Sequence, residues 1–280
     1  MIGAHRIGNA CLSLQFDHNL TKFDQTYVVC PLGGDRMKKV FEKYKINTQG
    51  FVYVSDSDLF EKFPSVANWY MTGETRGSWL TQQAMKFCML DTVDADVICI
   101  QDADIFFIKP YNCVVDNKLN VFYVAGRYAK HPQQYYQAFE NITGLPRQTE
   151  YSFVTDIMPV FKQDWHQLKS SIAQRFDQHW LDVLIDQTPW DYIENLKWFS
   201  EYEILGNWMV SQHTQFQLIE QGRFEYKRLE QLTHEDFPRG IDCQIERNPY
   251  GRILPFDYGT DTVLNLDAVL DRFVRTGLLN

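Results

Sequence analysis

Residues 97–108 read VICIQDADIFFI, with two carboxylates one residue apart between two apolar runs. The run 97–100 is short and rich in β-branched residues, which favours a buried strand over a helix. Asp102 and Asp104 follow this strand, and open α/β sheets bind their ligands at the carboxyl ends of strands. Carboxylate oxygens suit Mg²⁺ or Mn²⁺, ions that commonly carry substrate phosphates with them. The stretch therefore predicts an α/β fold with a metal site at Asp102 and Asp104.

A second pair of carboxylates provides a control within the same region. Asp94 and Asp96 have the same spacing but precede the apolar run. They should therefore lie at the opposite end of the strand, away from the ligand edge, and we expect no metal there.

Strands and helices are expected to alternate through the first half of the chain. Apolar runs at 27–30 and 51–54 predict two more strands, with a helix from about residue 35 to 44 between them. Such alternation is typical of a largely parallel sheet covered by helices. Later stretches are longer and aromatic-rich, and they predict helices at 132–141, 164–176, 179–185 and 201–212.

Charge and composition exclude several classes of partner. A net charge of −9 argues against nucleic acid, and no apolar run approaches the ~18 residues of a membrane-spanning helix. The six cysteines show no metal-binding spacing, and Cys88 and Cys99 fall in expected core elements. We therefore expect a soluble cytoplasmic protein with reduced thiols.

A long helix from about residue 76 to 90 should carry a polar face. Trp79, Gln82, Gln83 and Lys86 are spaced i, i+3, i+4 and i+7. A solvated face is one reading of this pattern. The other is a substrate-facing surface, since an indole beside amides and an ammonium suits a sugar ring and a phosphate. The opposite face is apolar and should pack on the sheet: Leu80, Ala84, Phe87 and Cys88.

The helix expected from residue 201 begins with two carboxylates that should differ in role. Ser200 and Glu203 match a capping box, so Glu203 has a structural explanation. Glu201 is not used by that box, and it is either a general base or a surface carboxylate of the first turn. Asp156 follows another short apolar run and is the rival base.

Three segments together resemble a known class of enzyme. Asp102-Ala103-Asp104 resembles the Asp-x-Asp motif of GT-A glycosyltransferases. Residues 77–86, GSWLTQQAMK, are similar to the Gly-x-Trp-x-x-Gln-Gln-x-x-Lys segment of a little-studied bacterial and phage family regarded as glycosyltransferases. Residues 200–207, SEYEILGN, resemble that family's Ser-Glu-Tyr-x-x-Tyr-Gly segment, with Leu205 where Tyr is usual. The resemblance covers roughly residues 20–215.

The resemblance implies a GT-A-like fold, with a mixed, mostly parallel sheet flanked by helices and a helical C-terminal lobe. It implies one domain over 1–280, with a nucleotide- and metal-binding half (about 1–125) and an acceptor-side half (about 126–280). It also implies Mn²⁺ or Mg²⁺, a nucleotide-sugar donor such as a UDP-sugar, and a carbohydrate or glycoconjugate acceptor. GT-A enzymes often take a third metal ligand from late in the chain, where His213 and His234 are the candidates.

Two alternatives to a glycosyltransferase stay open. A sugar-phosphate nucleotidyltransferase would use a Gly-rich, basic loop after the first strand, which Gly33-Gly34-Asp35-Arg36 matches only thinly. A carbohydrate-binding relative without turnover is the non-enzyme alternative. The paired carboxylates Asp102 and Asp104 argue against it, because a binding module does not need them.

Overall fold

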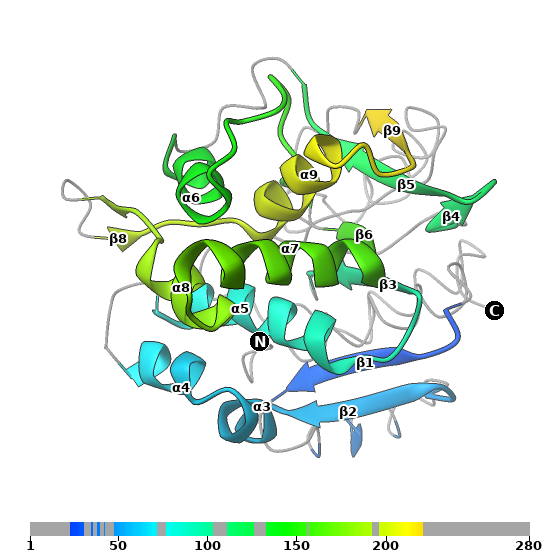
Figure 1. Cartoon of the computed structure of the whole chain (residues 1–280). Coiled ribbons are helices and arrows are strands. Elements are labelled where there is room, and N and C mark those ends of the chain that lie inside the picture. The colour runs from blue at the N-terminus through cyan, green and yellow to red at the C-terminus, as the bar shows by residue number, and fades with distance from the viewer. Residues whose placement is uncertain are drawn as a thin grey trace, which may run out of the picture. The chain divides into compact units, whose positions relative to one another are not determined.

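The computed structural model describes residues 23–30, 35, 38–39, 42, 48–71, 77–102, 111–125, 133–155, 157–191 and 196–220 (Figure 1). These residues form a mixed α/β protein, which confirms the expected class. They group into two compact units. The first contains the described residues up to 56 together with 102, 111 and 112, and the second contains those of 57–101 and 113–220.

A parallel pair of strands forms the first unit's sheet. Strand β1 (Thr26–Cys30) pairs with β2 (Phe51–Ser55), with Thr26 opposite Phe51. Parallel strands need a long crossover connection, and residues 35, 38, 39 and 42 of this one are helical. Both strands were predicted from their apolar runs, and both predictions are confirmed.

Three small sheets are described in the second unit. Strand β3 (Val97–Gln101) runs antiparallel to β6 (Ile157–Phe161). Strand β5 (Lys118–Tyr123) pairs antiparallel with β4 (Val114–Val115) and parallel with β9 (Phe216–Glu220). A short antiparallel pair joins β7 (Trp190–Asp191) and β8 (Leu196–Lys197).

The described strand pairings are less parallel than the sequence predicts. Two of these pairings are parallel and three are antiparallel. One source of the difference is β6, which runs back beside β3 in the opposite direction. The alternation of strands and helices could not reveal that partner, because β6 was not expected as a strand.

Seven helices are described: α3 (Asp56–Lys62), α4 (Pro64–Met71), α5 (Gly77–Thr92), α6 (Gln133–Thr143), α7 (Lys162–Phe176), α8 (Trp180–Asp186) and α9 (Glu201–Ser211). The five predicted within the second unit, α5 to α9, begin and end within about two residues of their expected bounds. Helix α9 is central, because it contacts α5, α6, α7 and β6 and is buried from Glu201 to Met209 (Figure 1). None of the described helices is long and apolar enough to cross a lipid bilayer.

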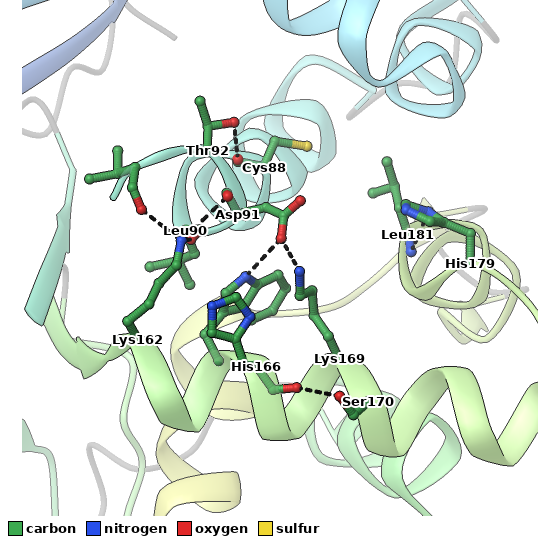
Figure 2. Close-up of polar contacts among 12 residues, drawn as sticks. Cys88, Leu90, Asp91, Thr92, Lys162, His166, Lys169, Ser170, His179 and Leu181 are labelled. Carbon is green, nitrogen blue, oxygen red and sulfur yellow. Dashed lines mark hydrogen bonds and ion pairs between the residues drawn. The ribbon is translucent and has the colours of Figure 1, made fainter. Parts of the chain in front are cut away.

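The C-terminal end of α5 is fixed against α7 by a lysine (Figure 2). Lys162 Nζ donates to the carbonyls of Leu90 at 2.6 Å and Val93 at 2.6 Å, groups that a helix end leaves without intrahelical partners. The Asp91 carboxylate forms an ion pair with Lys169 and accepts from Trp165 Nε1 at 3.4 Å. These contacts hold the end of α5 where the chain turns into β3.

Candidate functional site

Asp102 lies directly after β3, as predicted, and its side chain is half-buried. Asp94 and Asp96 are exposed before the same strand, which confirms their expected position at its other end. Asp104 lies outside the described residues, so the metal site stays a prediction. In the part of the chain that the structure describes, no three His, Cys, Asp or Glu side chains gather as metal ligands.

The polar face of α5 is buried in the second unit. Gln83 is only 4% exposed and Lys86 9%, while Gln82 and Trp79 are half-buried. The solvated-face reading is therefore wrong for Gln83 and Lys86. The physical reason is that α9 packs against this face, while Phe87 on the other face contacts Trp165 of α7 and Trp180 of α8. The apolar stripe on the other face is buried as expected: Leu80, Ala84, Phe87 and Cys88.

Lys86 is the centre of the contacts on this face. Its ammonium forms an ion pair with the Glu201 carboxylate and donates to Tyr202 Oη at 3.1 Å and to Gln83 Oε1 at 3.2 Å. The same ammonium lies 4.5 Å from the centre of the Tyr202 ring, within cation–π range. A lysine has three N–H donors, so these three acceptors match its capacity.

Glu201 is 1% exposed, in the first turn of α9. The surface-carboxylate alternative is therefore wrong. Its ion pair with Lys86 joins segment 77–86 to segment 200–207, two of the three segments on which the resemblance rests. A buried charge left without its partner costs several kcal/mol, so Lys86 and Glu201 depend on each other.

An aromatic cluster lies on the same face of α5, consisting of Trp79, Tyr135 and Trp198. Trp79 stacks on Tyr135 at 6.1 Å with an interplanar angle of 20°, and it meets Trp198 edge-on at 6.1 Å. Tyr135 and Trp198 are each 7% exposed, whereas Trp79 is half-buried. Val154 packs against the cluster. Trp79 therefore presents the partly accessible edge of an otherwise buried group.

Glu203 departs from the predicted capping box. Ser200 Oγ accepts from the Glu203 amide at 3.4 Å, so Ser200 caps the helix as expected. The Glu203 carboxylate, however, does not complete the box. It accepts from Ser152 Oγ, from Phe153 N at 3.1 Å and from Asn207 Nδ2 at 3.0 Å. The first turn of α9 is buried on all sides, so the carboxylate meets these donors in the core instead of folding back along the helix.

Burial changes the protonation of Glu203. Loss of solvation raises the pKa of its carboxyl to about 7, although the hydrogen bonds and the field of Arg147 act in the opposite direction. Glu203 therefore exchanges a proton in the neutral range while fully buried.

The remaining residues of segment 200–207 are explained by packing. A Cβ on Gly206 would lie 2.1 Å from Cγ of Phe153, so only glycine lets this ring approach the helix. Asn207 Oδ1 accepts from Gln148 N at 3.0 Å. Sequence reasoning missed Tyr202, Asn207 and their partners. The signal that could have found them is the nearly continuous apolar surface of α9, which implies that its few polar residues are buried.

The histidine and aspartate candidates are only partly described. His213 follows α9 with a left-handed φ of 55° and is exposed, and its role as a metal ligand stays a prediction. His234 and Asp156 lie outside the described residues. His179 caps α8, with Nδ1 accepting from Leu181 N at 3.4 Å (Figure 2).

Comparison with known proteins identifies a family but no function for its members. No curated protein and no solved structure matches the chain. Residues 11–235, well over half of the chain, match a family described only as a family of unknown function. The match includes the predicted metal stretch, the polar face of α5 and helix α9. The chain belongs to this family, DUF6492.

Proposed function

We propose that this chain is a metal-dependent glycosyltransferase of the GT-A type, which moves a sugar from a nucleotide-diphosphate sugar to a carbohydrate-containing acceptor. The observation that carries the proposal is the contact between Lys86 and Glu201. Two of the three segments that resemble those transferases, 77–86 and 200–207, are far apart in the sequence, and their polar residues meet in the core. That meeting supports treating them as one functional unit rather than as two chance matches.

The metal would be held by Asp102 and Asp104. Asp102 offers a half-buried carboxylate directly after a strand, and hard oxygen ligands of this kind suit Mn²⁺ or Mg²⁺. When bound, such an ion neutralises the diphosphate as the sugar leaves. A UDP-sugar is the donor that the resemblance implies.

The residues of the second unit would bind and orient a carbohydrate. Trp79 supplies an aromatic surface of the kind on which sugar rings stack, supported from behind by Tyr135 and Trp198. Lys86 is held in one orientation by Glu201, Tyr202 and Gln83. Because these partners occupy its three N–H donors, Lys86 would hold the polar face of α5 in one arrangement rather than donate hydrogen bonds to the substrate itself.

Glu201 is the proposed general base, with Asp156 as its rival. The ion pair with Lys86 favours the charged form of Glu201, which a base needs. It also ties the carboxylate to a lysine, so a second role, holding Lys86 in place, is equally consistent with the contacts. The two roles differ in outcome. A base is required for transfer itself, whereas a positioning partner is required for the fold around Lys86.

A carbohydrate-binding protein without turnover is the second candidate. The observation that favours it is the mutual neutralisation of Lys86 and Glu201 beside a partly accessible tryptophan. A purely binding surface would need that aromatic group and no reactive carboxylate. Release of nucleotide from the donor separates the two candidates. For the nucleotidyltransferase, of whose loop 33–36 only Asp35 is described, no observation adds support.

A thermal-shift experiment with UDP tests the proposal. Because a ligand stabilises the state that binds it, UDP should raise the melting temperature when Mn²⁺ is present and not when EDTA replaces it. Asp102→Asn and Asp104→Asn should abolish the shift. Asp94→Asn removes a carboxylate of the same spacing and is the matched control, so it should keep the shift. Equal loss in all three variants would contradict the proposed metal site.

A further inference from the structure

Glu203 and Asn207 hold a second segment of chain onto α9. We call residues 148–154 the docked segment. Glu203 accepts from Ser152 Oγ and Phe153 N, and Asn207 accepts from Gln148 N at 3.0 Å. Asn207 Nδ2 also donates to Glu203 Oε2 at 3.0 Å, so the two side chains act as one clamp.

The docked segment connects this clamp to the aromatic cluster. Val154 N donates at 3.1 Å to Ser152 Oγ, the same hydroxyl that donates to Glu203. Val154 then packs against Tyr135 and Trp198. A continuous line of contacts therefore runs from the Glu203 carboxylate to one wall of the aromatic cluster.

Packing and one backbone pairing also hold the segment in place. The Phe153 ring lies against Gly206 of α9, and Ser152 exchanges backbone hydrogen bonds of 2.8 and 2.9 Å with Val124 at the end of β5. These contacts carry no charge. Arg147 also donates to the Tyr151 carbonyl at 3.0 Å. Among the contacts named here, those of the Glu203 carboxyl are the ones proposed to respond to pH.

We propose that Glu203 is a proton-controlled latch, which keeps the docked segment on α9 when protonated and favours its release when ionised. Release would withdraw Val154 from the aromatic cluster and open one side of it. The latch does not depend on glycosyl transfer, because it follows from the burial and partners of one carboxylate.

The charged groups on the neighbouring elements leave Glu203 as the titrating member. Arg147, just before the docked segment, is the cation whose field reaches it. On α9 and α5, Glu201 and Lys86 neutralise each other. On α6, Glu140 accepts from Arg147 N at 3.2 Å, and on α7, Asp164 accepts from Thr214 Oγ1 at 3.0 Å. Asp164 is therefore held by a different partner, which makes it a useful control.

The direction of the pH effect follows from the pKa in the two states. In the docked state burial raises the pKa of Glu203 to about 7, whereas a released segment would let water reach the carboxyl and return its pKa to the ordinary value of 4.5. The docked state therefore binds the proton more tightly. Rising pH therefore favours release between pH 4.5, the ordinary pKa, and about pH 7, the pKa in the docked state. Above about pH 7 it has no further effect.

Hydrogen exchange of single backbone amides in the full chain measures this release. The probes are the amides of Gln148, Phe153 and Val154, whose acceptors are the clamp and Ser152. After correction for the intrinsic exchange rate, opening should increase on the order of 50-fold between about pH 5 and about pH 8. Glu203→Gln keeps an acceptor of the same shape without a titrating proton, so its opening should not vary with pH.

Asp164→Asn is the matched control, because it removes a buried carboxylate whose pKa is also raised, again by burial. It should retain the pH dependence of the wild-type protein. The proposal is overturned if the wild-type amides show no pH-dependent opening, or if Glu203→Gln shows the same increase. If Glu203→Gln does not fold, the carboxyl of Glu203 can be followed directly by ¹³C NMR in the wild-type protein. Titration below pH ~5 would then contradict the latch.

Discussion

The Lys86 ammonium and the Glu201 carboxylate form a buried ion pair that joins helix α5 to helix α9. Each helix contributes one of the three segments that resemble glycosyltransferases. The pair therefore gives a physical reason for the joint presence of these segments in one chain, because neither charge is tolerated in the core without the other.

Removing one member of this pair should destabilise the protein strongly. Lys86→Met or Glu201→Leu alone should each cost about 3–5 kcal/mol of unfolding free energy, since each leaves an uncompensated buried charge. The double variant should cost much less than the sum. Urea unfolding of the four proteins in a double-mutant cycle measures the coupling.

The exposed pair of Asp35 and Lys38, whose N–O distance is 3.8 Å, is the control for this cycle. Exposed pairs contribute roughly 0.2–1 kcal/mol, so Asp35→Ala should have little effect on unfolding. Additive costs for Lys86→Met and Glu201→Leu would show that the two residues do not depend on each other.

Gly206→Ala should destabilise the protein although alanine favours helices. Helix propensity alone would stabilise α9 by up to ~1 kcal/mol. The new Cβ, however, would meet the Phe153 ring at 2.1–2.6 Å, and overpacking of this kind costs about 1–3 kcal/mol or more. Thermal unfolding should show a lower melting temperature, with partial recovery when Phe153→Leu is added. A higher melting temperature in Gly206→Ala would contradict the packing described for this helix.

Stability should fall as pH rises through the neutral range because of Glu203. Its pKa is raised from 4.5 to about 7 in the folded protein, so the folded state binds its proton more tightly than the unfolded state does. The stability that Glu203 contributes through its bound proton is fully present below pH 4.5 and is lost by about pH 7. This is a change of about 3 kcal/mol in the free energy of unfolding. Denaturant unfolding of the wild-type protein and of Glu203→Gln should differ in pH dependence by this amount. Parallel pH profiles would show that Glu203 does not titrate in this range.

If Glu201 is the base, replacing it should lower sugar transfer by more than the accompanying loss of stability explains. Glu201→Gln keeps the shape and the hydrogen bond to Lys86 but removes the charge. Transfer per folded molecule should then fall roughly 10²-fold or more, while binding of UDP and Mn²⁺ persists. Unchanged transfer in Glu201→Gln, together with loss of transfer in Asp156→Asn, would move the role of base to Asp156.

The sequence predicted the bounds of β1 to β3 and of α5 to α9 well, did not predict α3, α4, β5, β6 or β9, and gave little on the contacts between elements. Helix α5 and strand β3 have clear periodicity, so both were placed within about two residues. Periodicity also identified the face of α5 that carries Trp79 and Lys86. It could not identify what covers that face, because Glu201 and Trp198 are distant in sequence and only the packing of α9 brings them close. Two-residue strands such as β4 and β7 have no periodicity to detect.

Glu203 shows the same limit at the level of one residue. The Ser-x-x-Glu pattern correctly placed the helix start at Ser200. The prediction that the Glu203 side chain completes the capping box was wrong, because a capping box assumes that the glutamate lies on an exposed first turn. The apolar residues of α9 surround the helix, as Tyr202, Ile204 and Trp208 show, so Glu203 is buried and bonds to Ser152 instead.

Release of UDP from a UDP-sugar is the most direct measurement of the proposed activity. The full chain should release UDP from at least one donor in a panel of UDP-hexoses and UDP-N-acetylhexosamines when Mn²⁺ is present, and release should stop with EDTA. Asp102→Asn should abolish the release and Asp94→Asn should retain it. If no donor is turned over with any divalent ion while carbohydrate still binds, the chain is a binding protein. Mn²⁺-dependent release that survives in Asp102→Asn would contradict the metal site on which the account is built.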